Sequence, residues 1–304
     1  AEANKIAFDH ADVPEYAFEK AGVVFNFSTD FLENWGNPVE NARRFTDMHV
    51  YKNGRKNKFI HISPQVSLTG AKADRWIVIN PGTEGLVALA IASVIQKENG
   101  AYKFLKKYLQ AYSPEKVAEA TGVSAEILSE LAIDAMEHGP LLALGGGNVS
   151  ATDQSVETLV AVNILNAVSG ALNKTILFYD QTAPESSTHQ DLTQLISDLN
   201  AGKIKLLIVD DSNPVYALPP SMGFLQAMKK AFVVSLASQK SETTHAANLV
   251  LPALTAYESW GDAFPRNGVR SIQQPVMSTV NMFDARARED ILLSVAQSVN
   301  KKAF

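Results

Sequence analysis

The amino-acid sequence predicts an α/β protein made of two doubly wound, mostly parallel sheets of the Rossmann-like type, in tandem along the chain. Short apolar runs without polar alternation recur through the 304 residues, which is typical of strands buried on both faces of a sheet. Each of these runs ends in a turn rich in Ser, Asp, Asn, Gly or Pro. Segments of helical periodicity separate the runs, and this alternation of strand and helix indicates parallel pairing.

In the first half, each apolar run leads directly into a polar turn. We expect strands at residues 23–27, 59–62 and 76–79, followed by polar turns at residues 28–30, 63–65 and 80–84. Helical spacing predicts helices at residues 15–20, 39–48, 86–99, 102–112, 114–120 and 124–138. Because open parallel sheets bind ligands at the carboxyl ends of their strands, these polar turns are the first places to look for a site.

Gly139 and Pro140 close the last of these helices, and they divide the chain into predicted units 1–139 and 140–304. The second half repeats the pattern, with strands expected at residues 141–144, 175–178, 204–209, 232–236 and 249–251. Helices are expected between them at residues 156–169, 188–201 and 222–230. The run Leu206 to Val209 has no alternation, so we expect it to be covered on both faces.

Composition excludes several classes of function. The formal net charge of −5 and a single dense basic run, residues 52–58, argue against nucleic-acid binding. No apolar run approaches the roughly 18 residues of a membrane span. Cysteine is absent, so this chain supplies no disulfide, no thiolate nucleophile, no iron-sulfur ligand and no Cys-based zinc site. The six histidines also lack metal-ligand spacing, and the start at Ala1 without an initiator Met suggests an excised or processed segment.

Three polar turns are the strongest candidates for a binding site. Gly145 to Gly147 follow a predicted strand and precede a helix, which suits either a plain turn or a loop that approaches a phosphate. Glu84 stands in the first turn of a predicted helix, where a carboxylate favours the helix dipole and is also suited to accept the N–H groups of a guanine. Glu242 lies beside hydroxyl side chains in the run SETT.

Taken together, these turns resemble the central region of the molybdopterin oxidoreductases, the dimethyl sulfoxide reductase superfamily. The matching blocks run from about Ala21 to Val276 and cover most of the chain. They read AGVVFNFSTDF at 21–31, RWIVINPGTEGLVALAIASVI at 75–95, LLIVDDSNPVYALP at 206–219, SETTHAANLVLPALTAYESWGDAF at 241–264 and NGVRSIQQPV at 267–276. The last three blocks are the most specific.

Finer features are similar to the members found in quinone-linked membrane complexes, such as the large subunit of alternative complex III. The blocks concerned are TDFLENWGNPVENAR at 29–43, SLTGAKAD at 67–74 and ESWGD at 258–262. This resemblance implies partner subunits that carry iron-sulfur clusters and membrane spans, and a location at the periplasmic face of a bacterial membrane. It also implies that the cofactor has been lost in some members.

The resemblance implies contacts to the guanosine and pyrophosphate groups of a bis-molybdopterin guanine dinucleotide. Strand-end turns offer backbone N–H donors for phosphate, and carboxylates suit guanine. The implied cofactor-binding residues are Ser28, Asp30, Ser63, Gly82, Thr83, Glu84, Gly146, Gly147, Asn148, Ser212, Asn213, Glu242 and Thr243.

The chain departs from the family pattern in two respects. It has no Cys for a cluster or for molybdenum, and the C-terminal barrel of the family would follow Phe304. We therefore expect this chain to be one segment of a longer large subunit. The segment would bind the cofactor nucleotides and would not be catalytic alone. Two alternatives are a cofactor-free structural scaffold of a quinone-linked electron-transfer complex and an unrelated doubly wound enzyme that uses another nucleotide.

Overall fold

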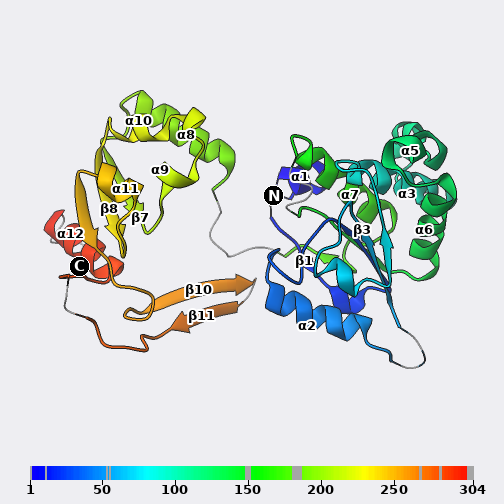
Figure 1. The fold of residues 1–304 in the computed structure, drawn as a ribbon, viewed down its shortest axis with the longest axis horizontal. Coiled ribbons are helices and arrows are strands. Elements are labelled where there is room, and N and C mark those ends of the chain that lie inside the picture. The colour runs from blue at the N-terminus through cyan, green and yellow to red at the C-terminus, as the bar shows by residue number, and fades with distance from the viewer. Residues whose placement is uncertain are drawn as a thin grey trace. The chain divides into compact units, whose positions relative to one another are not determined.

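The structure is a computed structural model that describes residues 2–10, 12–52, 54, 56–147, 152–179, 187–266, 269–280 and 283–299. The chain forms two compact units, residues 1–181 (unit 1) and residues 182–304 (unit 2) (Figure 1). Each unit is built on its own parallel sheet.

Unit 1 contains a four-stranded parallel sheet in the order β4-β3-β2-β5. Its strands are β2 (Val23–Phe27), β3 (Lys58–Ile62), β4 (Arg75–Ile77) and β5 (Leu141–Leu144). Side chains of β2 alternate between two apolar cores: Val23, Phe25 and Phe27 belong to one, and Val24 belongs to the other. Both faces are therefore buried, which explains why the apolar runs show no polar alternation.

Helices supply both cores. The first core takes side chains from α3 (Glu84–Asn99), α5 (Pro114–Thr121), α6 (Ala125–Glu137) and α7 (Ser155–Val168). The second takes Phe45 and Met48 from α2 (Pro38–His49), on the opposite face of the sheet. The remaining elements of unit 1 are α1 (Glu2–Phe8), β1 (Glu15–Tyr16), η1 (Phe18–Lys20), η2 (Gly70–Lys72), η3 (Lys103–Leu105), α4 (Lys106–Leu109), η4 (Gln110–Tyr112) and β6 (Ile176–Leu177).

The prediction of a helix at residues 15–20 was wrong. Glu15 and Tyr16 instead pair antiparallel with Leu177 and Ile176, and a 3₁₀ turn, η1, follows them. Tyr16 and its partner Ile176 lie 160 residues apart in the sequence. Local periodicity carries no information about such a partner, and tertiary pairing overrides it.

The division between the units lies later in the chain than the boundary predicted at Gly139. β5 follows that point directly, yet it pairs with β2 in register, from Val23 with Leu141 to Asn26 with Leu144. Residues 141–144 thus complete the first sheet rather than open the second, and α7 covers the same sheet. Gly139 and Pro140 lie inside unit 1, between the end of α6 and the start of β5.

Unit 2 contains a three-stranded parallel sheet in the order β7-β8-β9. The strands are β7 (Leu206–Asp210), β8 (Phe232–Ala237) and β9 (Leu249–Pro252). Val209 and Val233 pack against apolar residues of α8 (His189–Asn200) and α10 (Phe224–Met228), which form the core of the unit. Unit 2 also holds α9 (Pro214–Ala217), η6 (Pro220–Met222), α11 (Glu242–Ala246), the antiparallel hairpin of β10 (Gly261–Arg266) and β11 (Val269–Gln273), and α12 (Arg288–Val299).

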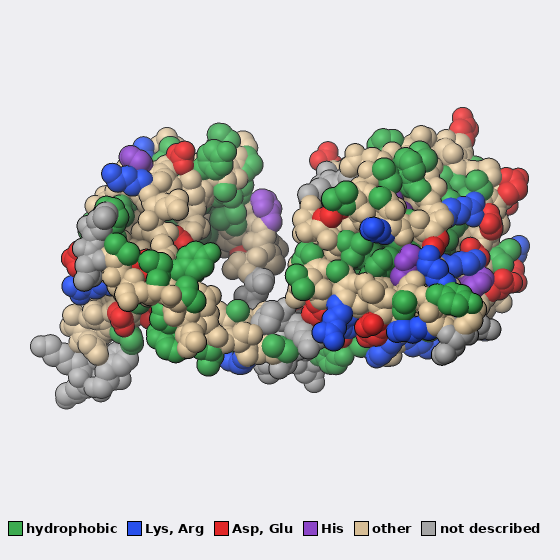
Figure 2. Space-filling view, turned by 60° about the horizontal axis from the view of Figure 1, so that its bottom comes forward, with side chains coloured by type: hydrophobic (Ala, Val, Ile, Leu, Met, Phe, Trp, Pro, Cys, Tyr) green, Lys and Arg blue, Asp and Glu red, His purple; other side chains and the backbone are tan. Residues whose placement is uncertain are grey.

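The fold-class prediction of an α/β chain with two parallel sheets in tandem is confirmed. Among the residues described, none of the helices has the length and apolar character needed to cross a membrane. On the face of unit 1 that Figure 2 shows, Lys and Arg side chains are interspersed with Asp and Glu.

Candidate functional site

The polar turns after β2 and β3 meet the first turn of α3 in unit 1. Ser28 Oγ donates a hydrogen bond to Glu84 Oε1 at 2.8 Å and lies 3.2 Å from Ser63 Oγ. Each of these three residues has about 1% of its surface exposed. The side chains of Ser28, Ser63 and Glu84 therefore satisfy one another and hold the two turns and the helix start together.

A second buried polar pair lies next to this cluster, between adjacent strands. Asn26 of β2 and His61 of β3 are register partners, and Asn26 Nδ2 donates to His61 Nδ1 at 2.9 Å. Asn26 also bonds both the N–H and the carbonyl oxygen of Thr29, and His61 Nε2 lies 3.3 Å from the carbonyl oxygen of Gln65. These contacts suit the neutral ring with its proton on Nε2, and burial lowers the pKa of the ring.

The turn after β5 approaches the turn after β2 very closely. A Cβ atom at Gly147 would lie 1.7 Å from the carbonyl oxygen of Ser28 and 2.9 Å from Thr29 Cα. Gly146 has a φ of +100° and is exposed, while Ser28 itself adopts a left-handed φ of 55°. Only glycine fits at position 147, so the backbone of this turn is part of the wall at the carboxyl end of the sheet.

Besides the exposed Gly146, three of the implied residues of unit 1 are accessible. Asp30 and Thr83 are half-buried and Gly82 is exposed, with a φ of +79°. The Thr83 hydroxyl donates to the carbonyl oxygen of Asn80 at 2.7 Å, so it closes the turn before α3. Asn148 lies outside the described residues.

In unit 2, the carboxyl end of β7 meets the start of α11. Asn213 Nδ2 donates to Glu242 Oε2 at 2.7 Å, and Asn213 Oδ1 accepts from both N–H and Oγ1 of Thr243 at 3.1 and 2.8 Å. Thr243 is fully buried, whereas Ser212 and Glu242 are exposed. The Asn213 amide, helped by the backbone and His245, holds the pKa of Glu242 below its ordinary value. Glu242 is therefore an anchored, ionised carboxylate that faces solvent.

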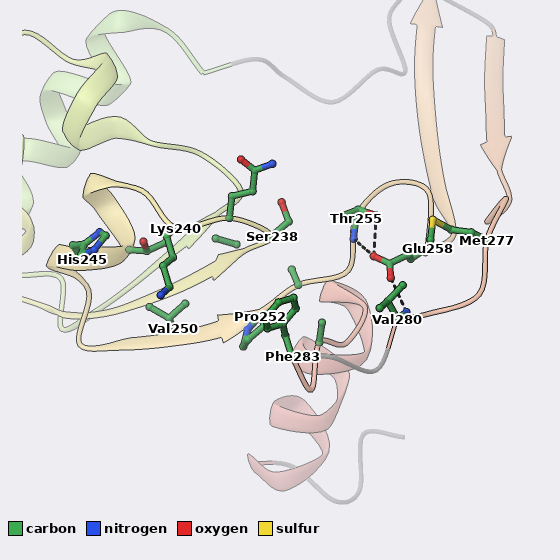
Figure 3. Close-up of a pocket in the computed structure, with 15 residues that line it drawn as sticks. Ser238, Lys240, His245, Val250, Pro252, Thr255, Glu258, Met277, Val280 and Phe283 are labelled. Carbon is green, nitrogen blue, oxygen red and sulfur yellow. Dashed lines mark hydrogen bonds between the residues drawn. The ribbon is translucent and has the colours of Figure 1, made fainter.

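A pocket of about 800 Å³ opens beside this cluster, inside unit 2. Its walls come from β8 and β9 and from the later stretches 253–258, 277–280 and 283–285 (Figure 3). The lining is mostly apolar and includes Val250, Pro252 and Phe283, with Lys240 and His245 toward α11.

Glu258 fastens the segment that covers this pocket. Its Oε2 accepts from the N–H and Oγ1 of Thr255 at 3.2 and 2.9 Å, and its Oε1 accepts from the N–H of Val280 at 2.8 Å (Figure 3). These hydrogen bonds hold the pKa of Glu258 below its ordinary value, and the bond from Val280 has the largest effect. One carboxylate thus ties together two stretches that lie 22 residues apart.

Sequence reasoning missed several residues that shape these sites. Asn26 and His61 stand at matching positions, one residue before the end of their strands, and a polar residue inside each apolar run was the available signal. Glu258 belongs to a block quoted for the resemblance, but nothing in the sequence indicated its bond to Val280. Among the described residues no group of three or more His, Asp or Glu is placed to hold a metal ion.

The residues present suit the nucleotide parts of a molybdopterin cofactor. Backbone N–H groups of open turns at the carboxyl ends of parallel strands are donors for phosphate. An exposed carboxylate with one oxygen bonded by Asn213 retains lone pairs that accept N–H groups of a guanine. The buried side chains of Ser28, Ser63, Glu84 and Thr243 would position these turns rather than touch a ligand.

Comparison with known proteins identifies the family of this chain. The family model named molybdopterin oxidoreductase matches residues 6–297. A menaquinone reductase, molybdopterin-binding-like subunit, from Nitratidesulfovibrio vulgaris is 28% identical over 303 residues, covering 92% of this chain and 43% of that protein. The molybdopterin-containing subunit of the arsenate respiratory reductase from Shewanella is 21% identical, and the match spans all of this chain and 45% of that protein.

The fold also matches a solved structure. Acetylene hydratase from Pelobacter acetylenicus has a TM-score of 0.75 and 17% sequence identity, over 99% of this chain and 50% of that one. The chain therefore spans about half the length of the relatives it matches.

Proposed function

The chain belongs to the molybdopterin oxidoreductase family, and we propose that it binds the guanine dinucleotide parts of a bis-molybdopterin cofactor. In this proposal it is a segment of a large subunit of a redox complex and is not catalytic alone. The observation that carries the proposal is Glu242, an exposed carboxylate fixed by Asn213 at the carboxyl end of a parallel sheet.

Each accessible residue has a defined part in the proposed site. Glu242 would accept N–H groups of a guanine, and Ser212 beside it would contact the same nucleotide. In unit 1, the backbone of Gly82, Thr83 and Gly146 would donate to pyrophosphate, and Asp30 would accept from a second nucleotide. The redox chemistry would belong to the molybdopterin, while the protein supplies position and electrostatics.

We further propose that iron-sulfur and membrane subunits are the partners, at the periplasmic face of a bacterial membrane. Two of the relatives reported above are named as subunits, which supports a multi-subunit assembly. The periplasmic location rests on the resemblance to exported quinone-linked complexes. Cell fractionation of the producing organism tests it, and recovery of the chain with cytoplasmic markers would contradict it.

Calorimetric titration of the purified chain with GDP tests nucleotide binding. We expect binding of GDP but not of ADP, and a Kd raised about tenfold in Glu242→Gln, the usual effect of losing one charge-assisted hydrogen bond. Glu289→Gln is the matched control, because Glu289 is also an exposed carboxylate in a first helical turn. Equal GDP affinity in the two variants would show that Glu242 does not bind guanine.

A cofactor-free scaffold is the second candidate function. The observation that favours it is the closed cluster of Ser28, Ser63 and Glu84, whose side chains bond one another and are buried. The same titration separates the two candidates. Absence of GDP binding at millimolar ligand, in a chain whose unfolding is cooperative, would favour the scaffold.

A further inference from the structure

The sheet of unit 2 has one apolar face that is largely uncovered. Leu206 is 54% exposed, Ile208 46%, Phe232 52% and Leu249 42%, and Val234 between them is half-buried. We call these five residues the open sheet face. The register pairs Leu206 with Phe232, Ile208 with Val234, and Val234 with Leu249, so all five project from the same side of the sheet.

On β7 and β8 the opposite side of the sheet is packed, whereas Val250 on the same side of the edge strand β9 is 41% exposed and lines the pocket. Val209 is 7% exposed and Val233 is 1% exposed, and both contact the core formed with α8 and α10. Ile208 and Val209 are neighbours in one strand, so their difference in exposure reflects the two faces and not the position of β7 in the sheet.

Parallel sheets are normally buried on both faces, and unit 1 follows this rule. All five residues of β2 are buried, between one core that includes α3 and α7 and another that includes α2. The equivalent second layer is missing from the described part of unit 2. Only the carboxyl end of the open side is partly covered, where Leu236 is 2% exposed and Arg288 forms an ion pair with Asp210.

The helix that begins at Arg288 does not supply this layer. None of the described side chains of α12 is buried, and Leu292 and Leu293 are each 46% exposed. A contiguous apolar area of this kind on a protein marks a surface that is covered by something else.

We propose that the open sheet face is covered by an amphipathic helical layer from the same polypeptide, outside the 304 residues of this chain. Two observations select this occupant. The run of Leu, Ile, Phe and Val side chains on a parallel sheet is the surface on which helices pack. The chain also spans 43% to 50% of the relatives named above, so such proteins contain the additional length that a second layer needs.

The experiment compares carbene photolabelling of two samples: the purified 304-residue chain and the protein isolated from the cells that produce it. We expect Ile208 and Phe232 to be labelled strongly in the purified chain. In the isolated protein their labelling should fall about tenfold, as expected when a half-exposed side chain becomes buried. Val209 is the internal control, with weak labelling in both samples.

Matched substitutions give an independent readout. In the 304-residue chain, Val209→Lys should abolish the cooperative unfolding of unit 2, whereas Ile208→Lys should leave its Tm unchanged. Equal destabilisation by the two substitutions, or weak labelling of Ile208 at low concentration, would mean that this chain covers the face itself and would overturn the proposal.

Other occupants give different results. Protection that appears only as the concentration of the 304-residue chain rises, and that Ile208→Lys removes, would identify a second copy. Protection in an intact complex that disappears when its subunits are separated would identify a partner subunit. Either outcome refutes a covering layer from the same polypeptide, and neither depends on whether the chain binds a nucleotide.

Discussion

Gly147→Ala is the substitution for which the structure predicts the largest effect at the carboxyl end of the first sheet. The added Cβ would lie 1.7 Å from the carbonyl oxygen of Ser28, and separations under 3.0 Å essentially never occur. The two turns must therefore separate by at least 1.3 Å, the difference between 3.0 and 1.7 Å. Both contacting groups are backbone atoms of a turn that Asn26 holds by two hydrogen bonds to Thr29, so the strain is not relieved by a side-chain rotation.

Overpacking of this kind costs about 3 kcal/mol of unfolding free energy. For a unit of this size, that corresponds to a fall in Tm of roughly 6 to 12 °C. Gly82→Ala is the control, because Gly82 also has a positive φ, of +79°, but no described atom lies within 4 Å of an added Cβ. Its cost is the left-handed backbone alone, about 1 kcal/mol.

Differential scanning calorimetry of the two variants and the parent chain measures these shifts. We expect Gly147→Ala to lower the Tm of unit 1 clearly more than Gly82→Ala does. Equal shifts would refute the inference that the turns after β2 and β5 are in rigid contact.

Two further predictions concern hydrogen-bonded groups in the two units. Because burial lowers the pKa of His61, the unfolded chain takes up a proton near the ordinary pKa of about 6.5 before the folded chain does. Stability is therefore full above that pH and falls below it, by up to about 1.4 kcal/mol per pH unit, until the folded ring also takes up its proton. Chemical denaturation between pH 7.5 and 5 should show this loss of unfolding free energy for the parent chain and a smaller loss for His61→Gln. Parallel plots of unfolding free energy against pH for the two proteins would contradict this role of His61. Glu258→Gln should speed proteolytic cleavage between residues 255 and 285, because its bond to Val280 ties this segment down, while Glu289→Gln should not. Mass spectrometry of the fragments measures the rate, and equal rates would show that the segment is held by other contacts.

The strands of unit 1 were predictable because burial on both faces leaves a direct mark in the sequence. Val23–Phe27 and Leu141–Leu144 are short apolar runs that end in polar turns, and both are strands. Their assignment to one sheet was not predictable. The pairing of β5 with β2 is nonlocal, whereas Gly139 and Pro140 have the local character of a domain boundary.

The same pattern misled at β7. Leu206 to Val209 has the composition of a strand covered on both faces, but only one face is covered among the described residues. The sequence of β7 is therefore suited to an environment that the described residues of unit 2 do not provide. The mismatch between composition and exposure is what makes the open sheet face informative.

The candidate site was predictable in position but not in the role of each side chain. The sequence places Ser28, Ser63 and Glu84 at strand ends and a helix start, yet it does not reveal that they bond one another. Serine, threonine and glutamate side chains serve both as ligand contacts and as internal partners within turns, and the distances in the structure separate the two roles.

This difference between internal partners and exposed groups also bears on how many nucleotides the purified chain binds. In unit 1 the implied carboxylate Glu84 is about 1% exposed, whereas in unit 2 Glu242 faces solvent. A guanine can reach Glu84 only if the hydrogen bond from Ser28 breaks and the turn after β2 moves. This rearrangement costs free energy, whereas binding to the exposed Glu242 requires no such rearrangement. The binding proposed for Glu242 therefore needs no rearrangement of unit 1. A measured stoichiometry near one GDP per chain would fit a site in unit 2 alone. A value near two would require a second site in unit 1, either beside the accessible Asp30 or at a Glu84 released from Ser28.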